Sequence, residues 1–182
     1  MDNIRTKNLY LIVGPSGAGK TAVLKGLERK GYKSVRSYTT RQPRYEGEDT
    51  YRFITEEEFS ALPDLITPVV YHGAHYGATT ELLREASLYI VEPKGVNDVK
   101  CLYTERPVEV IGITCSHSEL SRRLFARGGD QDSIKSRLEG DCTLFGCMTE
   151  FCDVVFRNER PLRETVELVF AYISKREEQA KN

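Results

Sequence analysis

Residues 8–21 read NLYLIVGPSGAGKT, and this stretch decides the fold. The apolar run Asn8 to Val13 predicts a buried strand, and Thr21 to Lys30 carries apolar residues at helical spacing. The loop between them satisfies the pattern G-x-x-x-x-G-K-[ST], in the strand-to-helix context that this pattern requires. The stretch therefore predicts a phosphate-binding loop in an α/β protein.

The residue types in the loop explain this prediction. Glycines let successive backbone N–H groups and the helix N-terminus point at phosphate oxygens. Lys20 supplies a positive charge for the β- and γ-phosphates, and the Thr21 hydroxyl can ligate Mg²⁺. The alternatives are a glycine-rich turn that binds nothing and a scaffold of the same fold that has lost nucleotide binding, and the intact loop argues against the scaffold. The sequence thus predicts ATP and Mg²⁺ as ligands of Gly14, Ser16, Gly17, Ala18, Gly19, Lys20 and Thr21.

Three further apolar runs predict buried parallel strands: Ser87 to Val91, Val108 to Thr114 and Cys152 to Phe156. Helical segments such as Ser118 to Ala126 and Leu162 to Lys175 separate or follow them. Strands alternating with helices predict an α/β fold with a parallel sheet flanked by helices. At 182 residues the chain fits one domain.

Two stretches interrupt the alternation. Ser34 to Ala78 is rich in Tyr, Thr, Arg and Gly, with short strand-like pieces and a helical segment at Glu56 to Ala61, which predicts an inserted lobe. In Arg127 to Arg137 the tripeptide Gly128-Gly129-Asp130 breaks a charged helical pattern, which predicts a hinge or lid.

The charge balance excludes a global electrostatic attraction to nucleic acid or to an anionic membrane, since 26 basic and 27 acidic residues leave a net charge of −1. Met1 to Leu9 contains no uninterrupted apolar stretch, so we expect no membrane segment and a cytoplasmic location. The five cysteines are an odd number, which favours reduced thiols over a disulfide framework.

A second anion site is predicted at Ser37 to Arg44, which reads SYTTRQPR. Arg41 and Arg44 lie beside the three aliphatic hydroxyl side chains of this run, a set that suits a dianionic phosphate because each guanidinium offers paired, permanently charged donors. A solvated polar loop is the alternative.

At this point the chain resembles guanylate kinase. The resemblance keeps the family order from Gly14 to Asn158. It is carried by the glycine loop, SYTTRQPR, Gly47-Glu48, Tyr51-Arg52-Phe53, Glu56 to Phe59, His75 to Thr79, Leu120 to Gly128, Ser136-Arg137-Leu138 and Asp153 to Asn158. It implies a P-loop kinase fold in a single domain, with a core at about 1–33, 88–126 and 142–182, an acceptor-binding lobe at about 34–87 and a short lid at about 127–141.

The resemblance also implies roles for individual residues. On the acceptor phosphate it places Arg41, Arg44, Tyr51 and Tyr76, and against the base Ser37. On the ATP side it places Arg127 and Asn158. The implied catalytic set is Lys20, Arg41, Arg123, Arg127 and Arg137, with the last three closing over the transferring group. An acidic residue is expected after the second arginine, and Glu46 and Glu48 both stand near that place.

Three positions depart from the family pattern. Thr67 stands where the family has a base-reading glutamate. Ile90 and Glu92 stand where it has Asp-x-Asp, which leaves Glu92 as a candidate substrate-binding residue.

The expected activity is transfer of the γ-phosphoryl group of MgATP to GMP or dGMP, with small nucleotides as partners and a monomer or homodimer as the assembly. The departures keep two alternatives open: another acceptor, either a different nucleotide or a ribose bisphosphate, and a non-catalytic binding module of the same fold.

Overall fold

The computed structural model describes residues 4, 6–43, 45–71, 73–126, 128 and 131–180. Outside residues 34–87, the elements in chain order are β1 (Leu9–Val13), α1 (Lys20–Glu28), β6 (Leu88–Ile90), α4 (Pro93–Leu102), β7 (Val108–Thr114), α5 (His117–Ala126), α6 (Gln131–Phe145), α7 (Met148–Phe151), β8 (Val154–Arg157) and α8 (Leu162–Gln179). Each of the four predicted strands is present, although the fourth, β8, is only half-buried and ends at an exposed Arg157.

These strands form one parallel sheet in the order β6-β1-β7-β8. The central strand β1 is fully buried, and its residues alternate between the two faces. Tyr10 and Ile12 join one apolar cluster, whereas Leu9, Leu11 and Val13 join the other. A strand whose side chains enter an apolar cluster on each face of the sheet needs helices on both faces, so the predicted α/β class is confirmed.

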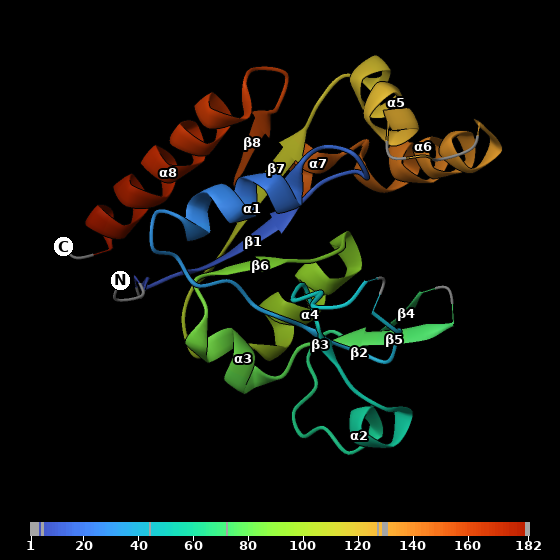
Figure 1. Cartoon of the computed structure of the whole chain (residues 1–182). Coiled ribbons are helices and arrows are strands. Elements are labelled where there is room, and N and C mark those ends of the chain that lie inside the picture. Colours follow the sequence, from blue (N-terminus) through green and yellow to red (C-terminus); the bar gives the residue numbers. More distant parts are fainter. Residues whose placement is uncertain are drawn as a thin grey trace.

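The helices divide between the faces accordingly (Figure 1). Apolar residues of α1, α5 and α8 belong to the cluster that contains Tyr10, while those of α3 (Thr80–Glu85), α4 and α7 belong to the cluster that contains Leu11. Helix α6 contributes to both, with Ile134 and Leu138 in the first cluster and Phe145 in the second. Helices α1 and α8 lie side by side, and Gly26 of α1 approaches Val166 of α8 so closely that an added Cβ would lie 2.5 Å from a valine methyl.

A second sheet lies within residues 34–87, which include the stretch Ser34 to Ala78 where composition predicts an inserted lobe. The elements of this segment are β2 (Tyr38–Thr39), β3 (Arg52–Phe53), α2 (Glu56–Ser60), β4 (Val69–Tyr71), β5 (Ala74–Gly77) and α3 (Thr80–Glu85). The four strands make a mixed sheet in the order β3-β2-β5-β4. Helix α2 lies where the sequence predicts it and starts with a capping box, in which Thr55 and Glu58 bond each other's backbone N–H.

The predicted break in the charged helical pattern lies between α5 and α6. Helix α5 ends at Ala126, Gly128 has φ +82°, and α6 begins at Gln131. Helix α6 then runs past Asp141, the expected end of the lid, to Phe145. Among the described residues, no helix is both long and apolar enough to cross a membrane.

Candidate active site

The loop between β1 and α1 passes close to neighbouring backbone and side chains. Gly14 has φ +153°, and a Cβ atom there would lie 2.0 Å from the backbone oxygen of Ile113 in β7. Gly19 has φ +98°, and a Cβ atom there would lie 2.3 Å from the amide nitrogen of Asn158. Because only glycine fits such positions, the path of the loop itself requires these two glycines.

The loop presents an N–H group to an anionic oxygen. The backbone N–H of Ser16 donates a hydrogen bond of 2.7 Å to a carboxylate oxygen of Asp141 in α6. N–H groups of a loop that leads into a helix N-terminus attract anions in this way. The carboxylate makes the contact that a phosphate oxygen would make, so the loop fits an anionic ligand.

Lys20 lies at the first position of α1, and its ammonium group turns back across the loop. It donates hydrogen bonds to the backbone oxygen of Gly14 at 2.5 Å and of Pro15 at 3.2 Å. A lysine held over the loop is placed to meet phosphate oxygens bound there. Among the described residues, no group of three or more His, Cys, Asp or Glu side chains could hold a metal ion. A loop threonine such as Thr21 can ligate Mg²⁺ jointly with nucleotide phosphates without such a group.

A pocket of about 90 Å³ connects the loop side of the core with the lobe. Its lining includes Thr21 at the start of α1, Ile90 at the end of β6, and Ser37 and Tyr51 of the lobe. The exposed Thr21 therefore faces the same space as two residues that were predicted from the sequence to bind the acceptor.

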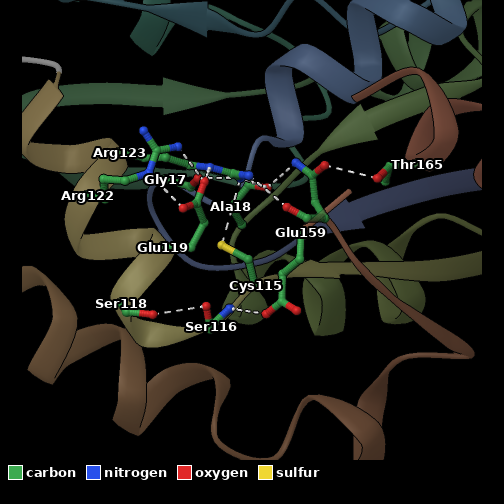
Figure 2. Close-up of polar contacts among 11 residues, drawn as sticks. Gly17, Ala18, Cys115, Ser116, Ser118, Glu119, Arg122, Arg123, Glu159 and Thr165 are labelled. Carbon is green, nitrogen blue, oxygen red and sulfur yellow. Dashed lines mark hydrogen bonds and ion pairs between the residues drawn. The ribbon is translucent and has the colours of Figure 1, made fainter. Parts of the chain in front are cut away.

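Arg123 holds the loop from the side of α5 (Figure 2). Its Nη1 donates to the backbone oxygens of Gly17 at 3.3 Å and Ala18 at 3.2 Å, and its Nη2 donates to the backbone oxygen of Asn158 at 2.7 Å. Its Nε donates to Glu119 at 2.7 Å. Arg123 thus contacts the backbone of the loop, and its expected position over the transferring group stays a prediction.

Asn158 braces the same loop from the end of β8. Its amide nitrogen donates to the backbone oxygen of Ala18 at 2.7 Å, and its amide oxygen accepts from the Thr165 hydroxyl at 3.0 Å. The side chain is buried, so both ends of the amide are satisfied inside the protein. Its expected place beside the adenine also stays a prediction.

The structure brings together three of the residues expected on the acceptor phosphate. The rings of Tyr51 and Tyr76 meet edge to face with centroids 5.5 Å apart. The Arg41 guanidinium lies 5.5 Å from the centroid of Tyr51 and 5.3 Å from that of Phe53. Residues from β5 and from the segments around β2 and β3 therefore converge on one cationic group.

Glu48 holds that cationic group in place. Its carboxylate, with only 4% of the side chain exposed, accepts from both terminal nitrogens of Arg41, at 2.8 and 3.3 Å. This pairing raises the pKa of the Arg41 guanidinium above its usual value. The Arg41 Nε is buried and has no hydrogen-bond partner among the described residues. A buried donor without a partner suits a ligand that brings an acceptor.

Thr67 does not face the pocket as a base-reading group. It is buried, and its hydroxyl lies 2.7 Å from the hydroxyl of Tyr89 in β6, which is buried as well. The Ser37 hydroxyl is a second partner of Tyr89.

Glu92 is exposed at the N-terminal cap of α4, on the loop side of the site. The pKa of its carboxyl group is raised, chiefly because the surrounding protein displaces water from it. The positive charge of Lys20 acts against this shift, and the negative charge of Asp141 adds to it. Its charged neighbours are thus Lys20, which ends the loop, and Asp141 of α6, which bonds to the loop backbone. Its contact with the acceptor stays a prediction.

Three predicted arginines lie at or beyond the limit of the described structure. Arg44 and Arg127 fall outside the described residues, and Arg137 belongs to α6 but its side chain is not among the described ones. Their expected roles stay predictions.

The structure also adds three residues that sequence reasoning missed or left undecided. Glu48 is the buried partner of Arg41, whereas Glu46 is exposed. Tyr89 was hidden in an apolar run, where a single tyrosine was the only available signal. Asp141 lies on a charged helix, and no local pattern distinguishes it from its neighbours.

Comparison with known proteins decides the family. The family model described as guanylate kinase matches residues 6–176. The chain belongs to the guanylate kinase family. The family comprises ATP-dependent phosphotransferases, and the resemblance found in the motifs is thereby confirmed.

Guanylate kinases from several bacteria are similar to this chain. The guanylate kinase of Bordetella pertussis is 33% identical over 143 residues, which make up 71% of this chain and 66% of that protein. The guanylate kinase of Methylobacillus flagellatus is 31% identical over 168 residues, 84% of this chain and 82% of that protein. The crystal structure of guanylate kinase from Anaplasma phagocytophilum matches with a TM-score of 0.67 and 21% identity, over 96% of this chain and 88% of that chain, which supports the guanylate kinase fold.

Proposed function

We propose that this chain is a nucleoside monophosphate kinase that transfers the γ-phosphoryl group of MgATP to GMP or dGMP, giving ADP and GDP or dGDP. One observation carries the proposal. Thr21, the last residue of the phosphate-loop motif, and the acceptor residues Ser37 and Tyr51 line one pocket, which supports a meeting of the donor and acceptor phosphates beside the loop. Membership of the guanylate kinase family supports the choice of acceptor.

The proposed chemistry needs no strong general base, because a phosphate monoester is already largely ionised near neutral pH, with a second pKa of about 6. Arg41, oriented by Glu48, would bind and align the acceptor phosphate with Tyr51 and Tyr76. Lys20 and the loop N–H groups would hold the donor phosphates. Mg²⁺, bound with the help of Thr21, supplies neutralisation of phosphate charge. Catalysis would rest on alignment and electrostatic stabilisation.

We propose three parts of the chain, with the bounds predicted from the sequence. Residues at about 1–33, 88–126 and 142–182 form the core, about 34–87 the acceptor-binding lobe, and about 127–141 a lid whose arginines would close over the transferring group and exclude water. Family membership and a net charge of −1 support small nucleotides as partners and a cytoplasmic location. We propose a monomer or homodimer.

A second candidate keeps the fold and changes the acceptor to another nucleotide or a ribose bisphosphate. It is favoured by the burial of Thr67 under Tyr89, which leaves no carboxylate at the position where the family reads guanine.

The test is release of ADP from MgATP by the purified protein with GMP, dGMP, AMP, CMP, UMP or ribose 1,5-bisphosphate. We expect stimulation by GMP or dGMP, and a loss of roughly 100- to 1000-fold in Lys20→Ala. Lys175→Ala, on the exposed face of α8, is the matched control for removal of a positive charge. Stimulation by another acceptor alone would select the second candidate. No stimulation by any acceptor would overturn the proposal in favour of a non-catalytic module.

A further inference from the structure

The boundary between the core sheet and the lobe contains a buried pair of hydroxyl groups. Tyr89 and Thr67 are each 5% exposed, and their hydroxyl oxygens lie 2.7 Å apart. Helix α4 packs over the pair, because a Cβ atom at Gly95 would lie 3.5 Å from the Thr67 methyl group. The Thr67 hydroxyl is therefore satisfied inside the protein and does not reach a ligand.

Tyr89 extends this pair toward the pocket. Its hydroxyl also interacts with the hydroxyl of Ser37, which is half-buried and lines the pocket beside Ile90. Burial raises the pKa of Tyr89, so the phenol stays neutral near neutral pH and can both donate and accept. Three hydroxyl groups thus form a chain from the interior to the acceptor pocket, which we call the hydroxyl chain (Thr67, Tyr89 and Ser37).

Among the described residues that line the pocket, Glu28 is the one carboxylate, and its oxygens are directed to other partners. Glu28 lines the same pocket and accepts hydrogen bonds from the Ser34 hydroxyl and from the Arg36 guanidinium, the latter at 3.3 Å. Glu92 is not among the residues that line this pocket, and its charged neighbours are Lys20 and Asp141. The group that faces an acceptor base from the hydroxyl chain is therefore a neutral hydroxyl.

A neutral hydroxyl and a carboxylate read a purine differently. One carboxylate can accept from the ring N–H and the 2-amino group of guanine together, whereas one hydroxyl makes a single contact as donor to the 6-oxo oxygen. The 6-oxo oxygen and the ring N–H are common to guanine and hypoxanthine. A site that binds a polar group specifically rejects an analogue without it by a factor of about 10⁴ to 10⁵. Without such a contact to the 2-amino group, no comparable rejection arises.

We infer that Tyr89, held by Thr67, is a positioning residue that orients Ser37 toward the 6-oxo edge of a purine acceptor, and that the pocket accepts hypoxanthine nucleotides nearly as well as guanine nucleotides. The inference rests on the proposed kinase function, and it assigns the acceptor class of that site as 6-oxopurine nucleotides.

The first measurement is kcat/KM for GMP and for inosine 5′-monophosphate with saturating MgATP. We expect the two values to agree within about tenfold, far from the discrimination of a site that binds the 2-amino group. A preference for GMP above about 100-fold would overturn the inference and leave the kinase function standing. Absence of turnover with both nucleotides, together with an active different acceptor, would instead overturn the proposed function.

The second measurement tests the hydroxyl chain itself. Tyr89→Phe removes one oxygen and should raise KM for both 6-oxopurine nucleotides together, by roughly tenfold, with KM for MgATP unchanged. Tyr103→Phe is the matched control, since Tyr103 is equally buried and its hydroxyl accepts from Arg106 instead. Equal KM values in the two variants would overturn the positioning role. If Tyr89→Phe does not fold, Thr67→Val removes the inner hydroxyl with little change of shape and decides by the same comparison with Tyr103→Phe.

Discussion

The carboxylate of Asp141 accepts a hydrogen bond of 2.7 Å from the backbone N–H of Ser16. This contact joins α6 to the phosphate loop across 125 positions of sequence. It also places a negative charge on a group that a bound phosphate would use. Asp141 would therefore compete with a donor phosphate for this N–H group, and we expect binding of the nucleotide to require α6 or the side chain to move away.

Asp141→Asn should consequently bind MgATP more tightly. Removing the competing charge is expected to lower the Kd by about fivefold, which corresponds to about 1 kcal/mol. Isothermal titration with MgATP measures this. Asp132→Asn, in the exposed first turn of the same helix, is the control for a general change of charge. A higher Kd in Asp141→Asn than in the control would contradict the competition.

Glu48 and Glu46 should behave differently when each is changed to glutamine. Glu48→Gln weakens a buried ion pair with Arg41, so we expect KM for the acceptor nucleotide to rise at least tenfold and the free energy of unfolding to fall by about 2 kcal/mol. Glu46 is exposed, so Glu46→Gln should leave KM nearly unchanged and the free energy of unfolding within about 0.5 kcal/mol of that of the unmodified protein. Steady-state kinetics and urea unfolding measure the two effects. Similar KM values in the two variants would show that Glu48 does not orient Arg41 for binding of the acceptor.

Two helical glycines should respond oppositely to alanine. In Gly26→Ala the new methyl group would meet Val166 at 2.5 Å, so we expect a loss of about 1 to 3 kcal/mol from overpacking between α1 and α8. Gly140 lies in α6 with no heavy atom within 4 Å of the new Cβ. Gly140→Ala should therefore stabilise the protein by about 0.5 to 1 kcal/mol through helix propensity. Urea unfolding of both variants measures this, and a change of the same sign in both would refute the packing argument.

Glu119 should give a pH-dependent contribution to stability. Hydrogen bonds from Arg122 and Arg123 lower the pKa of its carboxyl group from 4.5 to about 2. A carboxyl with a depressed pKa in the folded state stabilises it fully above the unfolded value, and loses that contribution as pH falls toward the folded value. The difference in unfolding free energy between the unmodified protein and Glu119→Gln should therefore shrink between about pH 4.5 and pH 2.

Salt provides the control for the Glu119 measurement. The side chains of Glu119 and Arg122 reach solvent, so 1 M NaCl should reduce the difference at neutral pH, because the Debye length falls to about 3 Å. A difference that stays constant between pH 7 and pH 3 would show that Glu119 acts through packing and not through its charge.

The sequence by itself determined the family, the four strands of the parallel sheet and the strand-loop-helix path of the glycine loop. The reason is physical: each of these features depends on residues close together along the chain. The apolar run Asn8 to Val13 and the glycines that follow it specify a strand, a tight loop and a helix start without help from distant residues. The lobe was likewise recognisable by composition, although its strand pairing was not.

Only the tertiary structure decided which side chains meet. Thr67 and Tyr89 are 22 positions apart, and the contact between Arg123 and Gly17 spans 106 positions. Such contacts arise where the two faces of the sheet, the lobe and α6 pack together, and local pattern carries no information about them. The choice of Glu48 over Glu46 followed from the burial of the Glu48 side chain and from its ion pair with Arg41. The sequence therefore predicted a phosphate loop, and packing decided which side chains lie together at the candidate acceptor site.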